Sequence, residues 1–125
     1  MGPVCDKLRS AVSISYKYLL TTTMLEIRPN CELCNCDLAP DSEEARICSY
    51  ECTFCASCVD DPLNNVCPNC GGGFAIRPLR PKSQHRAGIS LDHQPASAQK
   101  VHSRYNRAEI KQFVIGVKDI PIRKR

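Results

Sequence analysis

Residues 31–70 read CELCNCDLAPDSEEARICSYECTFCASCVDDPLNNVCPNC, and nine of the ten cysteines of the chain lie in this stretch. Without Cys36, the spacing is C31-x2-C34-x13-C48-x3-C52-x2-C55-x2-C58-x8-C67-x2-C70, which forms four close pairs. A C-x2-C pair on a tight turn directs both sulfurs to one side of the chain, where they form half of a tetrahedral metal site. The four pairs therefore predict two closed sites, each with four thiolate ligands.

Composition favours metal ions over disulfides as the partners of these cysteines. The chain has 125 residues and no Trp, and small chains with thin cores usually need disulfides or metals to fold. The N-terminal stretch has no clean apolar signal region, and no segment reaches the roughly 18–20 apolar residues that span a bilayer. We therefore expect a cytoplasmic protein with reduced thiols, no membrane association and two Zn²⁺ ions. Disulfides and an iron–sulfur cluster are the alternatives. The predicted ligands are Cys31, Cys34, Cys48, Cys52, Cys55, Cys58, Cys67 and Cys70.

We consider two ways of combining the four pairs. Sequential pairing would join the first pair to the second and the third to the fourth. Alternating pairing would join Cys31 and Cys34 with Cys55 and Cys58, and the other two pairs with each other. We favour the alternating form because only two residues separate Cys52 from Cys55, which suits interleaved loops.

This spacing resembles a RING finger, the cross-braced family with two zinc ions. The resemblance implies a small, metal-stabilised α+β domain of RING-like or related treble-clef type. RING domains usually have His as the fourth ligand, where this chain has Cys52. RING ubiquitin ligases also often carry a basic residue just after the eighth ligand, where this chain has Gly71. The surface for a ligase's partner enzyme is thus incomplete.

A second resemblance covers residues 24 to about 81. The segments MLEIRPNCELC, DSEEARICSYECTFCASC, VCPNCGGGF and RPLRP are similar to a small, mainly bacterial family of uncharacterised proteins, domain-of-unknown-function family 1272. The resemblance supports zinc and a bacterial source, and it implies no activity.

Two cysteines fall outside the predicted ligand set. Cys36 follows Cys34 by two residues, so it is a spare thiol, a redox-reactive thiol or a replacement for Cys34 as a ligand. Cys5 lies far from the cluster, and we expect a free thiol there.

We expect three segments with different roles. Residues 1–23 are an extension that the folded domain does not need, with Met24 a plausible start of translation. Residues 24–81 form the zinc domain, with short strands at 24–28, 47–51 and 74–76 and a helical turn within 59–66. Residues 82–125 form a basic tail, disordered over 81–99 and with a short helix or strand at 109–115. The flanks are therefore expected to be disordered or weakly ordered.

Charge separates the domain from the tail. Residues 24–76 contain nine acidic and two basic residues, a net charge of −7, whereas residues 77–125 contain three acidic and twelve basic residues, a net charge of +9. Basic segments bind phosphates, so nucleic acid is a candidate partner of the tail. The candidate contacts are Arg77, Arg80, Lys82, Arg86, Arg104, Arg107, Arg123, Lys124 and Arg125.

Three classes of function remain open. The leading class is a structural zinc module that mediates protein–protein interaction. The alternatives are a zinc protein that binds nucleic acid through its tail, and a RING-like ubiquitin-ligase scaffold or thiol redox protein. The sequence presents no catalytic constellation or small-molecule site, because its three histidines all lie in the tail. We therefore expect a non-enzymatic protein.

Overall fold

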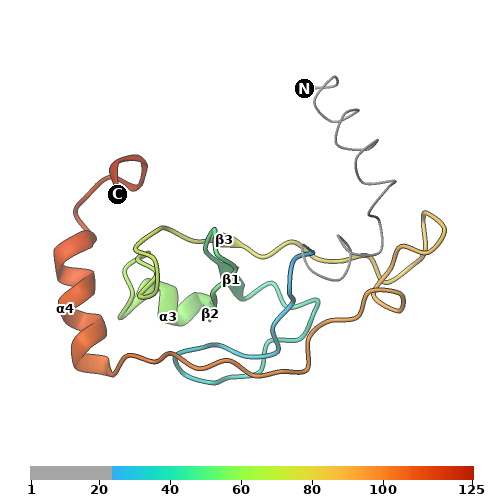
Figure 1. Cartoon of the computed structure of the whole chain (residues 1–125), viewed down its shortest axis with the longest axis horizontal. Helices are drawn as coiled ribbons and strands as arrows, with labels where there is room; N and C mark the ends of the chain where they lie inside the picture. Colours follow the sequence, from blue (N-terminus) through green and yellow to red (C-terminus); the bar gives the residue numbers. More distant parts are fainter. Residues whose placement is uncertain (1–23) are drawn as a thin grey trace.

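The computed structural model describes residues 24–125, drawn in colour in Figure 1. Predictions about residues 1–23, including Cys5 and the start at Met24, lie outside the described residues. The described elements are β1 (Ala45–Ile47), β2 (Thr53–Cys55), α3 (Ala56–Asp60), β3 (Ala75–Ile76), α4 (Arg107–Val117) and a 3-10 helix, η1 (Ile122–Lys124). The small α+β fold expected from the sequence is confirmed. Within this part of the chain, no helix is both long and apolar enough to cross a membrane.

A three-stranded antiparallel sheet lies at the centre of the domain. Its order is β2-β1-β3, with Ala45 opposite Cys55 in the first pair and Ile47 opposite Ala75 in the second. The connection from β1 to β2 is the loop that contains Cys48 and Cys52, so a predicted metal-binding loop also forms the turn of the hairpin. Helix α3 follows β2 directly, with Cys55 at its N-cap.

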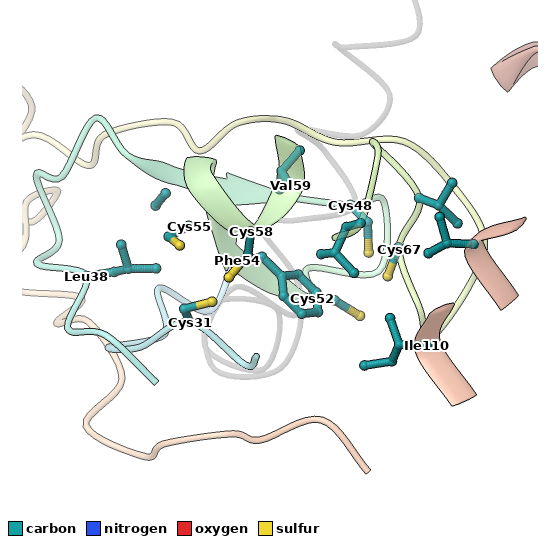
Figure 2. Packing of buried hydrophobic residues seen from close by; sticks show 14 residues of the cluster. Cys31, Leu38, Cys48, Cys52, Phe54, Cys55, Cys58, Val59, Cys67 and Ile110 are labelled. Carbon is teal, nitrogen blue, oxygen red and sulfur yellow. The ribbon is translucent and has the colours of Figure 1, made fainter. Parts of the chain in front are cut away.

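The core combines cysteines with a few apolar side chains. Phe54 is fully buried and makes an edge-to-face contact with Phe74, with ring centroids 5.4 Å apart. In Figure 2, Phe54 lies between a group of sulfurs around Cys31 and a second group around Cys48. One buried cluster contains both groups. The apolar core is small, and cysteines make up much of the buried cluster.

The tail is a packed part of the domain. Helix α4 begins at a capping box, in which the Asn106 side chain accepts the Glu109 N–H at 2.8 Å and the Glu109 carboxylate accepts the Asn106 N–H at 3.0 Å. Ile110 and Val114, one helical turn apart, are buried in the same cluster as the cysteines. The alternative of a helix at 109–115 is therefore confirmed.

The segment before α4 runs alongside the first cysteine loop (Figure 1). The Ser97 N–H donates to the Ile27 carbonyl at 2.9 Å, and the Ser103 N–H donates to the Glu32 carbonyl at 2.8 Å. The Asn30 side chain donates to the Val101 carbonyl at 2.9 Å. Within residues 81–99, the Ser97 contact and the hydrogen bond from the Leu91 N–H to the Pro81 carbonyl at 2.8 Å give an ordered arrangement where disorder was expected.

The strands and the helical turn expected in the cysteine domain are confirmed only in part. The closing strand at 74–76 is confirmed by β3, whereas β1 begins and ends earlier than the strand expected at 47–51. The helical turn lies in α3 rather than within 59–66. Residues 24–28 do not form a strand, and guanidinium groups bind two of their carbonyls instead. Arg80 donates to the Leu25 carbonyl at 2.7 Å, and Arg77 donates to the Arg28 carbonyl at 2.8 Å.

Candidate metal centres

The first cluster joins a loop to the junction of a strand and a helix. Cys31 and Cys34 come from the loop after residue 30, Cys55 ends β2 and Cys58 lies in α3. Their four sulfurs are all within 4.8 Å of one another, and the Cys34 and Cys55 sulfurs are 3.7 Å apart. Three of these residues are buried, and Cys34 is exposed.

The second cluster joins the hairpin turn to the last cysteine pair. The sulfurs of Cys48, Cys67 and Cys70 are within 4.8 Å of one another. The Cys52 thiol lies within hydrogen-bond reach of the Cys48 and Cys67 thiols. The first compact group therefore has four of the predicted ligands, and the second has three, with Cys52 beside Cys48 and Cys67. Both groups agree with the alternating pairing and not with the sequential one.

Backbone N–H groups point at the sulfurs, as expected for thiolates. Cys31 Sγ accepts from the N–H of Leu33 at 3.4 Å and of Cys34 at 3.5 Å. Cys48 Sγ accepts from the Tyr50 N–H at 3.3 Å, and Cys70 Sγ accepts from the Gly72 N–H at 3.4 Å. Hydrogen bonds to the charged form of a group favour that form. The loops are therefore arranged to hold charged sulfur.

The sulfurs are too close together to ionise independently. Hydrogen bonds from the Cys52 and Cys67 thiols lower the pKa of Cys48 to about 3. The corresponding hydrogen bonds with Cys48 and Cys52 raise the pKa of Cys67. In the first cluster, burial raises the pKa of Cys58. One thiolate in a group thus opposes the ionisation of its neighbours, and a cation at the centre would remove that opposition.

The spacing of the sulfurs fits a tetrahedral metal ion. Four thiolates bound at about 2.3 Å define a tetrahedron whose edges are about 3.8 Å long. The 3.7 Å between the Cys34 and Cys55 sulfurs agrees with that edge. Each cluster can therefore hold a metal ion through cysteine alone.

Glu32 connects the two clusters, and sequence reasoning missed it. Its side chain is only 2% exposed and forms an ion pair with Arg28 at 2.7 Å. The carboxylate accepts the Thr53 N–H at 2.6 Å and the Asn69 side-chain amide at 3.4 Å. Glu32 lies in the first cysteine loop and Asn69 in the last, so one carboxylate joins both. The acidic residue inside a C-x2-C pair was the only sequence signal for this role.

Cys36 lies beside the first cluster without belonging to the group of four. It is exposed, and its thiol lies next to those of Cys34 and Cys55. Four other sulfurs form the compact group at this site. A spare thiol, a redox-reactive thiol and a replacement for Cys34 as a ligand therefore all stay predictions for Cys36.

The nine basic candidates divide into two kinds. Four are engaged within the domain. Arg77 is fully buried, and Arg80 donates to the Leu25 carbonyl at 2.7 Å. Lys82 pairs with Asp41 at 3.0 Å, and Arg125 donates to the Asn65 carbonyl at 2.9 Å. The others, Arg86, Arg104, Arg107, Arg123 and Lys124, are exposed. Arg77 is inaccessible to a phosphate, whereas the exposed group and Lys82, whose side chain is 70% exposed, stay available for such contacts.

Comparison with known proteins identifies the family. Residues 24–80 match the model of a family described as a protein of unknown function, DUF1272. The chain is also 51% identical over 78 residues to an uncharacterised protein of Rhizobium meliloti (strain 1021), an alignment that covers 62% of this chain and 86% of the relative. The chain belongs to the DUF1272 family.

The DUF1272 match covers the two clusters and ends before most of the tail. It includes all eight clustered cysteines and stops at residue 80, so α4 lies outside it. No solved structure matches the chain. The positions of the DUF1272 cysteines are therefore known here from the geometry of this structure alone.

Proposed function

We propose that this DUF1272 protein is a zinc-dependent structural module that mediates protein–protein interaction. The observation that supports zinc is the first cluster, where four cysteine sulfurs would fill the coordination positions of tetrahedral zinc. In the second cluster three sulfurs form the group and Cys52, beside Cys48 and Cys67, would supply the fourth. Catalytic zinc keeps one position open for water or substrate. Zinc would supply folding free energy, on the order of 10 kcal/mol for a structural site, to a domain with a small core.

The size of the clusters supports zinc over an iron–sulfur centre. Tetrahedral thiolate sites hold either zinc or iron–sulfur clusters. The four sulfurs of the first cluster, and three of those in the second, are within 4.8 Å of one another and leave room for one ion at each centre. Elemental analysis of the protein, purified without oxidation, should give two zinc ions per chain and no iron or acid-labile sulfide. Stoichiometric iron and sulfide would contradict the proposal. The interleaved ligands support a RING-like cross-brace.

For the partner we propose an extended protein segment that binds along β3. This strand is at the edge of the sheet, and Ile76 is 64% exposed on it. An open hollow of about 540 Å³ adjoins the strand, and its lining includes Phe74, Arg46 and Asp60. Edge strands bind extended peptides through main-chain hydrogen bonds, with hollows beside them accepting side chains. The metal clusters would keep this edge in place.

Photo-crosslinking can test the partner surface. A photoreactive amino acid at position 76 should give a discrete adduct in the cells that encode the protein, and one at Ile115 on α4 should not. Ile115 is a matched control, because it is 52% exposed. Unlabelled wild-type protein should compete for the adduct, and the Ile76→Asp variant should not. Equal adducts from both positions, or equal competition by the variant, would reject this surface.

Nucleic-acid binding is a second candidate, supported by the exposed basic residues around α4. Arg104 and Arg107 precede and begin the helix, and Arg123 and Lys124 follow it. Each phosphate contact contributes about 0.9 to the slope of log affinity against log salt for duplex DNA. The Arg104→Ala/Arg107→Ala variant should therefore reduce that slope by nearly 2 if these residues bind DNA. An unchanged slope, or no binding by the wild type, would remove this candidate.

A further inference from the structure

The first and last cysteine loops have the same backbone structure. In the first loop, the Cys31 N–H donates to the Cys36 carbonyl at 2.9 Å, and the Asn35 N–H donates to the Cys31 carbonyl at 2.9 Å. In the last loop, the Cys67 N–H donates to the Gly72 carbonyl at 2.8 Å. The Gly71 N–H likewise donates to the Cys67 carbonyl at 2.7 Å. Cys36 and Gly72 therefore occupy equivalent positions.

The residues before these two positions confirm the equivalence. Asn35 has φ 63° and Gly71 has φ 82°, so both loops turn through the left-handed region at the same step. Asn and Gly are the residues that adopt this conformation most readily. Because glycine fills the position of Cys36 in the last loop, the backbone of such a loop does not require a side chain there. The thiol of Cys36 is therefore an addition to the loop.

A side chain at this position is directed towards the second ligand of its own loop. A Cβ atom placed on Gly72 would lie 3.4 Å from the Cys70 sulfur. In the first loop the position has a real side chain, and the Cys36 thiol lies near those of Cys34 and Cys55. The first site thus has five sulfurs for four coordination positions, whereas the second has four.

Burial shows which sulfur can be exchanged. Cys31, Cys55 and Cys58 are buried, whereas Cys34 and Cys36 are both exposed at the outer side of the site. In the described conformation Cys34 belongs to the compact group, and Cys36 is outside it. Exchanging Cys34 for Cys36 would change only the exposed part of the loop and leave the three buried ligands in place.

We propose that Cys34 and Cys36 are alternative fourth ligands of the first metal site, which therefore keeps its ion when either thiol is lost. This inference rests on the proposed zinc function. The second site has glycine in place of the reserve thiol and loses its ion when Cys70 is lost. The two sites differ accordingly. In the first, either of two exposed thiolates can be the fourth ligand of the ion, whereas in the second the same four cysteines always bind it.

Counting zinc ions in a series of alanine variants tests this asymmetry. Native mass spectrometry should find two ions per chain in wild type, Cys34→Ala and Cys36→Ala, and one in Cys34→Ala/Cys36→Ala. The matched variant of the second site, Cys70→Ala, should retain one. Moving the reserve thiol, in Cys70→Ala/Gly72→Cys, should restore the second ion. Because Cys70→Ala/Gly72→Cys changes only the last loop, it tests the inference even if a variant of the first loop fails to fold.

The outcomes distinguish this inference from the proposed function. Fewer than two ions in the wild type would overturn the zinc proposal itself. Two ions in the wild type and fewer in Cys34→Ala would overturn the alternative-ligand inference alone. Two ions in the double variant of the first loop, or in Cys70→Ala, would overturn it as well. Failure of the transplant to regain an ion would show that this loop position cannot supply a ligand.

Discussion

Glu32 and Thr53 are joined by a pair of hydrogen bonds, one through the Glu32 backbone and one through its carboxylate. The Glu32 N–H donates to the Thr53 carbonyl at 2.9 Å, and the Thr53 N–H donates to Glu32 Oε2 at 2.6 Å. Thr53 follows Cys52 of the second cluster and precedes Cys55 of the first by two residues. This pair therefore fixes the first cysteine loop against the strand that connects the two sites.

Removing the Glu32 carboxylate should destabilise the domain. Glu32→Ala leaves the Arg28 guanidinium without its buried partner and the Thr53 N–H without an acceptor. Breaking a buried ion pair from one side costs about 3–5 kcal/mol. Glu26→Ala is the matched control, because Glu26 contacts the same guanidinium from a side chain that is 42% exposed. Denaturant unfolding at fixed zinc concentration measures both, and equal losses would contradict the role of Glu32.

Helix α4 should contribute to stability through one face. Ile110 is 1% exposed in the core, so Ile110→Ala should cost about 2–5 kcal/mol. Ile115 is 52% exposed on the same helix, and Ile115→Ala should change stability by no more than about 0.5 kcal/mol. Thermal unfolding of the zinc-loaded variants compares them. If Ile110→Ala unfolded at the same temperature as the wild type, the tail would not unfold cooperatively with the rest of the domain.

Two glycines should respond to alanine in opposite directions. Gly71 has φ 82°, and a left-handed conformation costs roughly 1–2 kcal/mol for other residues, so Gly71→Ala should destabilise the last cysteine loop. Gly116 lies within α4, where an added Cβ meets nothing within 4 Å. Gly116→Ala should therefore stabilise the protein by about 0.5–1 kcal/mol. The denaturant midpoint of each variant shows whether its stability falls or rises. A higher midpoint for Gly71→Ala would contradict a turn that requires glycine at this position.

Acid should release the metal and unfold the core in the same step. Thiols bind metal only as thiolates, so protons compete with the ion for the sulfurs. Binding a cation holds the pKa of the ligand thiols below their ordinary value. Their contribution to stability is therefore present at neutral pH and is lost as the pH falls. A zinc-sensitive dye should detect release together with loss of near-UV circular dichroism. Release without any change in the fold would argue against a structural metal.

The parts predicted from the sequence are those set by local spacing. A C-x2-C pair determines the position of its two sulfurs within one loop, and the two residues between Cys52 and Cys55 favoured interleaving. The sequence left helix and strand open for residues 109–115, and the capping box formed by Asn106 and Glu109 explains why they are helical.

The parts missed depend on contacts between distant residues. Buried Arg77 reaches the carbonyls of Arg28 and Ala39 across much of the sequence. Nothing local distinguishes it from the exposed Arg104. Residues 81–99 were expected to be disordered because they are polar, yet the Ser97 N–H donates to the Ile27 carbonyl, and two buried side chains on α4 anchor the segment that follows. Burial of this kind cannot be read from composition alone.

The central claim is that the eight cysteines bind two ions through alternating pairs. Anomalous diffraction from crystals of the zinc-loaded protein, recorded on both sides of the zinc absorption edge, tests it most directly. We expect two zinc peaks per chain. One should lie among Cys31, Cys55, Cys58 and either Cys34 or Cys36, and the other among Cys48, Cys52, Cys67 and Cys70. A single peak, or one peak bound by Cys31, Cys34, Cys48 and Cys52, would contradict it.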